Sequence, residues 1–389
     1  MKVAYVFAYN PALPGVLSKI HDKLNLMRAA GAEVEGLAIC AQMPDEKEQV
    51  AGIRFALFNY SAPKWLEFGP LKLLLILHRS REAAKMLESH LASINPDVVV
   101  MRYGTANVFT ATVMRRFKFV FEHNTKEVEQ LAMNYSGVQR SGWEKASVFW
   151  LEKYFAPRIL RRAAGIVGVT HEITNYELQR AKRMLPSITI ANGIDTSRCR
   201  ISQAGEYRSG TLHLLFLAGV AAPWHGVDRL LKSIKPHHDV KVWLAGNFLP
   251  ADLELAKSLG NKAELTGMLK GDALDAVFGK VHLAIASLAP QRVGITEMSA
   301  LKVREYAARA VPFVTAFDDP DLDESRNRNF WFRVASGEGE FELDQVIEFA
   351  RKATQAETRQ ALRKFAEEQL DYAAKMRRLV EFLHTLHRP

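Results

Sequence analysis

Short apolar runs alternate with longer amphipathic segments along the first half of the chain. We expect β-strands at residues 2–7, 33–39, 97–102, 119–122, 165–169 and 187–191. Apolar positions at helical spacing lie between them, most clearly over residues 17–30, 71–94 and 143–164. Apolar strands joined by helices are typical of a parallel sheet covered on both faces. The first half therefore predicts a Rossmann-like α/β domain.

The second half repeats this architecture without any visible sequence repeat. We expect its strands at residues 212–217, 240–245, 262–265, 281–286 and 311–315, with helices between them. The segment 196–211 is polar, contains glycine and has no periodicity, which is typical of a connection between domains. We predict one Rossmann-like domain over residues 1–196, a second over 211–356, a cleft between them, and helices over 357–389.

Composition sets limits on the class of protein. The chain has 389 residues, 48% hydrophobic and 24% charged, as expected for two globular domains. A strand-like run follows Met1 and Lys2 directly, so we expect no signal peptide, and the apolar run at residues 73–77 is too short to span a bilayer. Cys40 and Cys199 lie far apart and have no metal or redox spacing. We therefore expect a cytoplasmic protein.

The charge points to an anionic partner. A net charge of +9 and a pI near 9.4 favour binding to nucleotide sugars, acidic lipid surfaces or nucleic acid. Charge by itself does not choose among these three, so the choice depends on motifs.

The most informative stretch covers residues 292–310 and contains two carboxylates, Glu297 and Glu305, separated by seven residues. An expected strand runs up to it and another leaves it. Ser299 is a good N-cap, so we expect Glu297 in the loop at the carboxyl end of a strand and Glu305 about two turns into a helix. Ligands of open α/β sheets collect at that edge, where the first free amides of a helix can bind phosphate. These amides belong to Ser299, Ala300, Leu301 and Lys302.

This E-x7-E pattern resembles the motif of retaining, two-domain (GT-B) glycosyltransferases of family 4, also called glycosyl transferases group 1. The resemblance implies that Glu297 contacts the hydroxyls of the transferred sugar and Glu305 those of the ribose. It also implies a nucleotide-diphosphate sugar as donor, no cofactor, no metal required for the chemistry, and last helices that cross back to the first domain. Glu305 alone could equally be a solvated helix residue, because two glutamates at this spacing occur by chance in many helices.

The first domain has two further points of resemblance. Gly15 follows the first strand and a proline, where the family's loop faces the donor phosphates and the acceptor; an ordinary Pro/Gly turn is the alternative. Glu122 and His123 end an expected strand, where the family places a Glu-His pair that reaches the transferred sugar and the acceptor. A structural histidine is the alternative for His123.

The loop after the first strand of the second domain departs from the family pattern. It begins at Gly219, but Val220 and His225 stand where the commoner pattern has Arg and Lys. We expect His225 to donate a neutral hydrogen bond to the phosphates, and Arg292 or Lys302 to supply the missing charge. Further along, the resemblance implies that Gly267 and Met268 read the nucleobase by backbone contacts.

Two other stretches allow alternatives. Residues 143–162 mix aromatic and basic side chains, which indicates either a helix packed on the sheet or a patch that binds an anionic membrane and presents a lipid-linked acceptor. The acidic residues Asp318, Asp319 and Asp321 favour a solvated loop over a manganese site.

The best interpretation is a retaining glycosyltransferase that moves a sugar to a glycan or lipid-linked acceptor in polysaccharide or glycolipid synthesis. Its expected partners are a nucleotide sugar, that acceptor and, weakly, an anionic membrane surface, without nucleic acid. A sugar-nucleotide epimerase or hydrolase on the same fold stays open. So does a GT-B-like partner subunit without catalysis, because both usual loop cations are missing.

Overall fold

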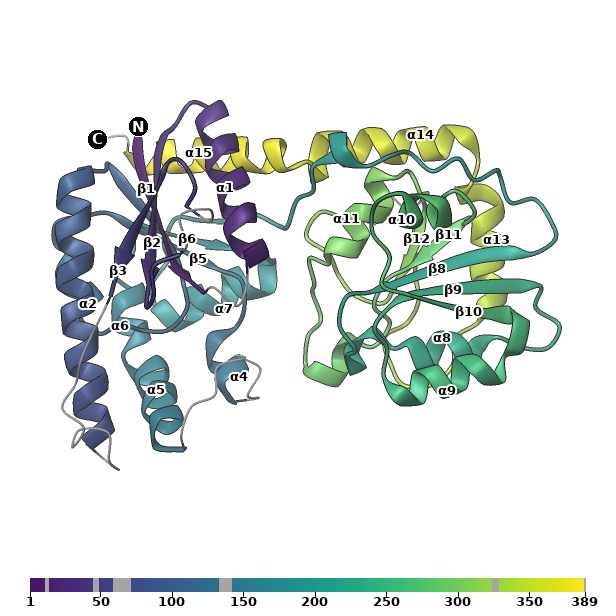
Figure 1. Cartoon of the computed structure of the whole chain (residues 1–389), viewed down its shortest axis with the longest axis horizontal. Helices are drawn as coiled ribbons and strands as arrows, with labels where there is room; N and C mark the ends of the chain where they lie inside the picture. Colours follow the sequence, from purple (N-terminus) through teal and green to yellow (C-terminus); the bar gives the residue numbers. More distant parts are fainter. Residues whose placement is uncertain (11–13, 45–48, 59–70, 133–141, 324–328, 388–389) are drawn as a thin grey trace. The chain divides into compact units, whose positions relative to one another are not determined.

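The structure, a computed structural model, describes residues 1–10, 14–44, 49–58, 71–132, 142–323 and 329–387. The chain divides into two compact units (Figure 1). The first contains residues 1–190 and 376–389, and the second contains residues 191–375. Each unit is a parallel sheet with helices on both of its faces, as the alternation of apolar runs and helical segments predicts.

The first unit contains a seven-stranded sheet in the order β3-β2-β1-β4-β5-β6-β7, with all neighbours parallel. The strands are β1 (Lys2–Tyr9), β2 (Glu33–Cys40), β3 (Ile53–Leu57), β4 (Val98–Arg102), β5 (Phe119–His123), β6 (Gly165–Gly168) and β7 (Ser187–Thr189). The helices are α1 (Pro14–Ala29), α2 (Lys72–Ile94), α3 (Thr110–Val113), α4 (Glu127–Ala132), α5 (Gly142–Tyr154), α6 (Ala156–Leu160) and α7 (His171–Ala181). Successive residues of β1 from Val3 to Phe7 are all buried, because both faces of the sheet are covered.

The second unit contains a six-stranded parallel sheet in the order β10-β9-β8-β11-β12-β13. The strands are β8 (Leu212–Ala218), β9 (Val240–Gly246), β10 (Ala263–Gly267), β11 (Leu283–Ile285), β12 (Phe313–Thr315) and β13 (Trp331–Arg333). The helices are α8 (Val227–Ser233), α9 (Pro250–Ser258), α10 (Gly271–Phe278), α11 (Leu301–Ala308), α13 (Leu343–Ala353) and α14 (Ala356–Phe365). The last helix, α15 (Tyr372–His387), begins in this unit and continues in the first. The strand order reverses between β8 and β11, and such a switch point is where open sheets of this kind bind ligands.

The structure differs from the sequence expectations at several elements. The sequence pattern missed β3 and β13, which are short edge strands whose burial is incomplete. The expected helix over residues 143–164 is divided into α5 and α6, with Pro157 in the first turn of α6.

The polar segment 196–211 belongs to the second unit. Ser202 donates from its backbone to Arg309 and from its hydroxyl to Phe278, and the backbone of Tyr207 donates to the Thr354 hydroxyl. These contacts fix a segment that has no helical or strand periodicity, so its lack of pattern does not make it a free linker.

The last helix, α15, contributes to both units along its length. Residues 372–375 belong to the second unit, and the residues from Met376 onward belong to the first. In the first unit, Phe382 and Leu386 lie so close to Gly165 on β6 that a Cβ at Gly165 would be 3.1 Å from each. Met376, Leu379, Val380 and Leu383 are buried. This end of the chain is therefore part of the core of the first unit.

Candidate functional site

The loop from Gly219 to Gly226 lies at the switch point of the second sheet. It follows β8, and the chain segment after β11 packs against its far end. Gly226 has a φ of +62°, and a Cβ there would lie 2.9 Å from backbone and side-chain atoms of Ala289. Gly246, at the end of β9, has a φ of +126° and would place a Cβ only 1.8 Å from the carbonyl oxygen of Ala218. Both glycines are needed for the close backbone packing under this loop.

His225 holds the loop together from inside. Its Nε2 lies 3.1 Å from the carbonyl oxygen of Val220 and therefore carries the proton and donates to it. Nδ1 is then an acceptor, 3.1 Å from the Ser287 hydroxyl and 3.3 Å from the Lys302 ammonium. Burial and the nearby Lys302 charge lower the pKa of His225 to about 3, so the ring is neutral. The expectation that His225 donates to a phosphate is not supported, because its one N–H already binds Val220.

Lys302 places a positive charge beside the Gly219 loop, which has neither of the two cations of the commoner family pattern. It lies in the first turn of α11, and its Nζ is 4.5 Å from the centre of the Phe216 ring as well as 3.3 Å from His225. Burial lowers the pKa of this lysine to about 7, and within the described ranges no carboxylate pairs with it. The side chain keeps some exposure to solvent. An ammonium without a counter-ion beside a glycine loop is arranged to receive an anion.

Arg292 is engaged with two carboxylates. Its guanidinium binds Asp228 through two hydrogen bonds of 2.8 and 3.0 Å and contacts Glu338 through Nε at 2.9 Å. These two partners raise the pKa of Arg292 further above its ordinary value. A movement of Arg292 onto phosphate oxygens would separate it from Asp228 and Glu338, so its contact with phosphate stays a prediction. Lys302 is the better candidate.

The two motif glutamates lie on either side of the start of α11. Glu297 is half-buried in the preceding loop, and its backbone forms an isolated parallel β-bridge with the backbone of Asp318. Glu305 lies on the helix, half-buried, and accepts a 2.7 Å hydrogen bond from Arg309. The helix begins at Leu301, and its N-cap is Ala300 without a side-chain cap. Contacts of Glu297 and Glu305 with a ligand stay predictions.

Ser299 does not cap this helix, contrary to expectation. Its hydroxyl accepts a 2.7 Å bond from the backbone N–H of Asn192, and its carbonyl accepts one from the Asn192 side chain. The carbonyl of Asn192 in turn accepts from Arg304 on α11. Asn192 therefore fixes the loop that carries Glu297, a role that the sequence pattern gave no signal for.

The acidic group at residues 318–321 is not a solvated loop throughout. Asp319 is buried and makes a bidentate ion pair with Arg304, which has no exposed surface. Asp321 binds both Arg304 and Lys375. Only Asp318 is largely exposed, and it pairs with Arg333. The buried guanidinium of Arg304 requires these carboxylates as partners, so Asp319 and Asp321 stabilise the packing of α11.

Three further expected site residues have these positions. Gly15 is the second residue of α1, which begins at Pro14, three residues before the expected helical segment 17–30. Gly267 ends β10 with a φ of +68°, and Met268 follows it with an exposed side chain. Their contacts with donor phosphates and nucleobase stay predictions.

In the first unit, Glu122 and His123 point to opposite faces of β5, because successive strand residues alternate. Glu122 pairs with Lys23 on α1 and lies 3.2 Å from the Tyr5 hydroxyl. Lys23 lowers the pKa of Glu122 despite its burial. The two residues therefore do not act as the adjacent pair that the sequence suggests, and any contact of either with a sugar stays a prediction.

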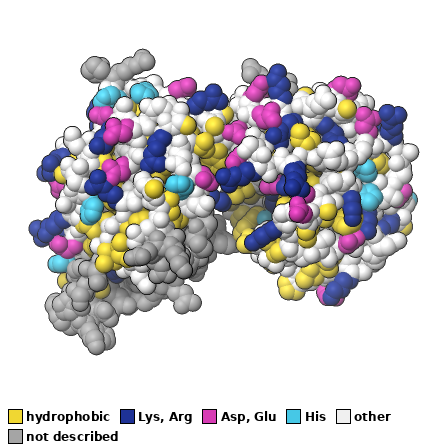
Figure 2. Space-filling view, turned by 45° about the horizontal axis from the view of Figure 1, so that its top comes forward, with side chains coloured by type: hydrophobic (Ala, Val, Ile, Leu, Met, Phe, Trp, Pro, Cys, Tyr) yellow, Lys and Arg dark blue, Asp and Glu magenta, His cyan; other side chains and the backbone are white. Residues whose placement is uncertain are grey.

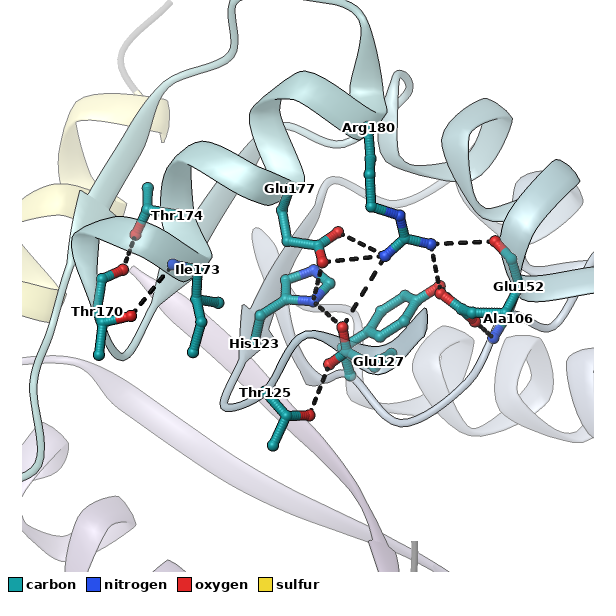
Figure 3. A network of polar contacts seen from close by, with 11 residues as sticks. Ala106, His123, Thr125, Glu127, Glu152, Thr170, Ile173, Thr174, Glu177 and Arg180 are labelled. Carbon is teal, nitrogen blue, oxygen red and sulfur yellow. Dashed lines mark hydrogen bonds and ion pairs between the residues drawn. The ribbon is translucent and has the colours of Figure 1, made fainter. Parts of the chain in front are cut away.

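His123 instead belongs to a buried polar network with α4, α5 and α7 (Figure 3). Its Nδ1 lies 3.2 Å from Glu127 and 3.8 Å from Glu177. Figure 3 shows the Arg180 guanidinium between Glu177 and Glu152, with contacts of 2.9 and 2.6 Å. Nε2 of His123 has no hydrogen-bond partner among the described residues.

Burial shifts the pKa values of His123, Glu127 and Glu177 in this network. It lowers the pKa of His123 to about 4, so the imidazole is neutral. It raises the pKa of Glu127 to about 8 and that of Glu177 to about 7, even though His123 and Arg180 oppose the shift at Glu177. The sequence indicated His123 but not Glu127 or Glu177. Glu127 begins α4 four residues after His123, whereas Glu177 is brought there only by the fold.

Basic side chains do not form a separate area on the surface that Figure 2 shows. Lys and Arg are interspersed with Asp and Glu on that face of each unit. On this face the positive charge is therefore spread, and we expect binding of an anion to depend on particular positions such as Lys302. Among the described helices, none combines the length and apolar character that crossing a bilayer requires.

Comparison with known proteins identifies the fold. No protein-family model and no curated protein sequence matches this chain. Solved structures do match along the whole length. A glycosyltransferase from Rickettsia africae ESF-5 has a TM-score of 0.64 and 15% identity, covering 99% of this chain and 98% of that one.

Two other solved structures show the same architecture. Sucrose-phosphate synthase from Thermosynechococcus elongatus has a TM-score of 0.63 and 12% identity, with 99% of each chain covered. HepE from Anabaena, in complex with UDP and glucose, has a TM-score of 0.57 and 14% identity, covering 99% of this chain and all of that one. The chain therefore has the GT-B fold, with its two Rossmann-like units.

Proposed function

We propose that this protein is a retaining glycosyltransferase that uses a nucleotide-diphosphate sugar as its donor. The observation that carries the proposal is Lys302, a cation that has no carboxylate partner among the described residues and lies at the switch point of the second sheet, beside the Gly219 loop. A diphosphate is the leaving group of such a donor and needs positive charge as the glycosidic bond breaks. The solved structures of HepE with UDP and with UDP-glucose support this donor class.

Each group of the site has one part in the proposed reaction. The Lys302 ammonium binds the diphosphate, and the amides at the start of α11 add hydrogen bonds. Glu297 binds hydroxyls of the transferred sugar, and Glu305 binds ribose hydroxyls through the carboxylate that Arg309 orients. The leaving diphosphate accepts the acceptor's proton on the same face of the sugar, so no protein base and no metal is assigned.

The first test is a thermal-shift screen with UDP-, GDP- and ADP-sugars, followed by product analysis with the donor that raises Tm most. We expect release of the nucleoside diphosphate, and a product anomer, read by NMR, with the configuration of the donor. Glu297→Gln should lower turnover more than nucleotide affinity. An inverted product would contradict the retaining mechanism, and an altered sugar still joined to the nucleotide would indicate an epimerase. If no nucleotide sugar binds, the donor proposal is wrong.

The acceptor side of the proposal includes a membrane surface. The end of α5 exposes Trp150 and Tyr154, and the following turn exposes Arg158. Aromatic side chains beside basic ones are suited to the interface of an anionic bilayer, where a lipid-linked acceptor would be located. We propose weak, salt-sensitive binding of this area to such a membrane.

Vesicle sedimentation tests this binding. Vesicles containing phosphatidylserine should retain the protein at low salt and release it at high salt. Replacement of Arg158, Arg161 and Arg162 by Gln should reduce retention without unfolding the first unit, whereas Lys257→Gln on α9 serves as a control. Equal retention of the triple variant and the wild type would refute the membrane patch.

A further inference from the structure

Three potential metal ligands from three separate elements meet inside the first unit. They are His123 at the end of β5, Glu127 at the start of α4 and Glu177 on α7. One ligand atom from each lies within 4.8 Å of the other two. His123 and Glu177 are fully buried and Glu127 is only 3% exposed. Groups that are mostly found on surfaces are therefore concentrated in the interior.

The charges of this interior region do not balance. Glu127, Glu152 and Glu177 supply three carboxylates, whereas the only guanidinium that contacts them in the described structure belongs to Arg180. With all of these groups ionised, two negative charges would be left uncompensated in a region without solvent, which is strongly unfavourable. Two bound protons or one divalent cation would neutralise them.

The carboxylates of this region differ in how well they are paired with cations and N–H donors. Glu152 accepts from Arg180, from the backbone N–H of Ala106 at 2.6 Å and from the Tyr103 hydroxyl, so its oxygens are satisfied. Glu127 has only longer contacts with charged groups and hydroxyls: His123 at 3.2 Å, the Thr125 hydroxyl at 3.5 Å and Arg180 at 3.9 Å, besides a hydrogen bond with the Glu177 carboxyl. A cation would therefore add most at Glu127.

The site is also rigid before any ion binds. The Tyr103 ring stacks on the His123 imidazole with centroids 4.4 Å apart, which fixes the plane of the ring. Nη1 of Arg180 donates to both carboxylate oxygens of Glu177, at 3.0 and 2.9 Å, which fixes the carboxylate with Oε1 3.8 Å from Nδ1 of His123. Ligands held in place by outer contacts of this kind are typical of metal sites.

We propose that His123, Glu127 and Glu177 bind a zinc-type divalent cation that stabilises the first unit. One imidazole nitrogen and two carboxylate oxygens suit Zn²⁺ and Co²⁺ better than Mg²⁺ or Ca²⁺, which prefer oxygen alone. In a tetrahedral zinc site, neighbouring ligand atoms are about 3.3 Å apart. Nδ1 of His123 lies 3.2 Å from the Glu127 oxygen and 3.8 Å from the Glu177 oxygen, close to that separation. When Nδ1 binds the cation, the neutral imidazole carries its single proton on Nε2, and the protons that had balanced the carboxylates are released to solvent.

This cation would join the end of β5 to α4 and α7 and would take no part in sugar transfer. The proposal therefore stands or falls independently of the glycosyltransferase proposal. The structure contains a second group, His237, His238 and Asp344, which lies at the surface of the second unit. Nδ1 of His238 already accepts from the backbone of Lys235, which leaves that residue one nitrogen. The second group is the natural competitor in any test.

The experiment uses the untagged full-length chain, stripped with EDTA and titrated with Zn²⁺ in competition with a chromogenic chelator. We expect one tightly bound equivalent and a higher Tm. Glu127→Gln and Glu177→Gln should each weaken binding by at least about 10-fold. Glu172→Gln, also on α7 but paired with Lys126, is the matched control and should bind as the wild type does.

Two measurements keep the test decisive if a ligand variant folds poorly. X-ray absorption of the wild-type Zn²⁺ complex should show one imidazole with oxygen ligands. Two imidazoles in that spectrum, or loss of binding in His237→Gln with Glu127→Gln unaffected, would assign the ion to the surface group and overturn the proposal. Absence of a stoichiometric ion in the wild type would overturn it as well.

Discussion

Replacement of Lys302 by Met tests the phosphate site most directly. Methionine keeps the length of the side chain and its contact with Phe216, whose ring centre lies 4.5 Å from Nζ, but removes the charge. No carboxylate loses its partner, because none pairs with Lys302 in the described part of the chain. We therefore expect the variant to fold with a Tm equal to or above that of the wild type, since the cost of desolvating an ammonium disappears.

The effect on ligand binding should be large. A hydrogen bond to a charged group contributes about 1.5–3 kcal/mol, and each 1.36 kcal/mol is a factor of ten. Lys302→Met should therefore weaken binding of the best nucleoside diphosphate by about 10- to 150-fold. Lys257→Met provides the control, because Lys257 is an exposed lysine of the same unit that pairs only with Glu254 at its surface.

The pH dependence gives a second, independent readout. The free protein has a Lys302 pKa of about 7, lowered by burial, and a bound diphosphate should raise it. Above pH 7, binding then takes up a proton, and affinity should fall by up to about tenfold per pH unit until the pKa of the complex is reached. Below pH 7 this contribution is fully present.

Isothermal titration calorimetry at pH 7, 8 and 9, in buffers of different ionisation enthalpy, measures affinity and proton uptake together. Lys302→Met should show neither the slope nor the uptake of this proton. His225 does not contribute in this range, because its pKa of about 3 keeps it neutral. Wild-type affinity in Lys302→Met, with an unchanged pH slope, would show that the phosphates bind elsewhere.

Three other variants test the supporting structure. Arg292→Ala should lower Tm, because it removes the ion pairs with Asp228 and Glu338 at a cost of about 1 kcal/mol or more. Nucleotide affinity should change by less than about threefold. A large loss of affinity at unchanged Tm would instead indicate that Arg292 binds phosphate. Gly246→Ala should unfold the second unit or destabilise it by several kcal/mol in urea denaturation, since its Cβ would collide with a backbone oxygen, and a wild-type midpoint would contradict that packing. Leu379→Ala should cost about 2–5 kcal/mol in the unfolding of the first unit, measured by the same method.

Sequence reasoning succeeded where a single physical signal determines the structure. The apolar runs at residues 2–7 and 212–217 are buried on both faces, and that burial requires helices on both sides of a parallel sheet. The reversal of strand order at β8 and β11 then puts the Gly219 loop and the start of α11 at one edge. Edge strands such as β13 carry less burial and so gave no comparable signal.

The parts that sequence reasoning missed depend on partners far away in the chain. Ser299 has the right residue type for an N-cap, yet the backbone of Asn192, 107 residues away, takes its hydroxyl. Arg292 and Lys302 are both cations near the motif, and the sequence does not distinguish them. In the fold, Arg292 is paired with Asp228 and Glu338, whereas Lys302 has no carboxylate partner in the described part of the chain. Glu177 has no local motif at all and reaches His123 only through the packing of α7.

The return of α15 to the first unit has a consequence for how the chain matures during synthesis. Residues 1–190 leave the ribosome long before Met376. The core of the first unit therefore cannot be completed until the whole of the second unit has been synthesised and α15 has emerged. Until then the surface that α15 later covers, including the start of β6 at Gly165 where Phe382 and Leu386 pack, is without its native cover. A ribosome that stalls before residue 376 would therefore display an incomplete domain with apolar surface, which is the kind of species that chaperones bind.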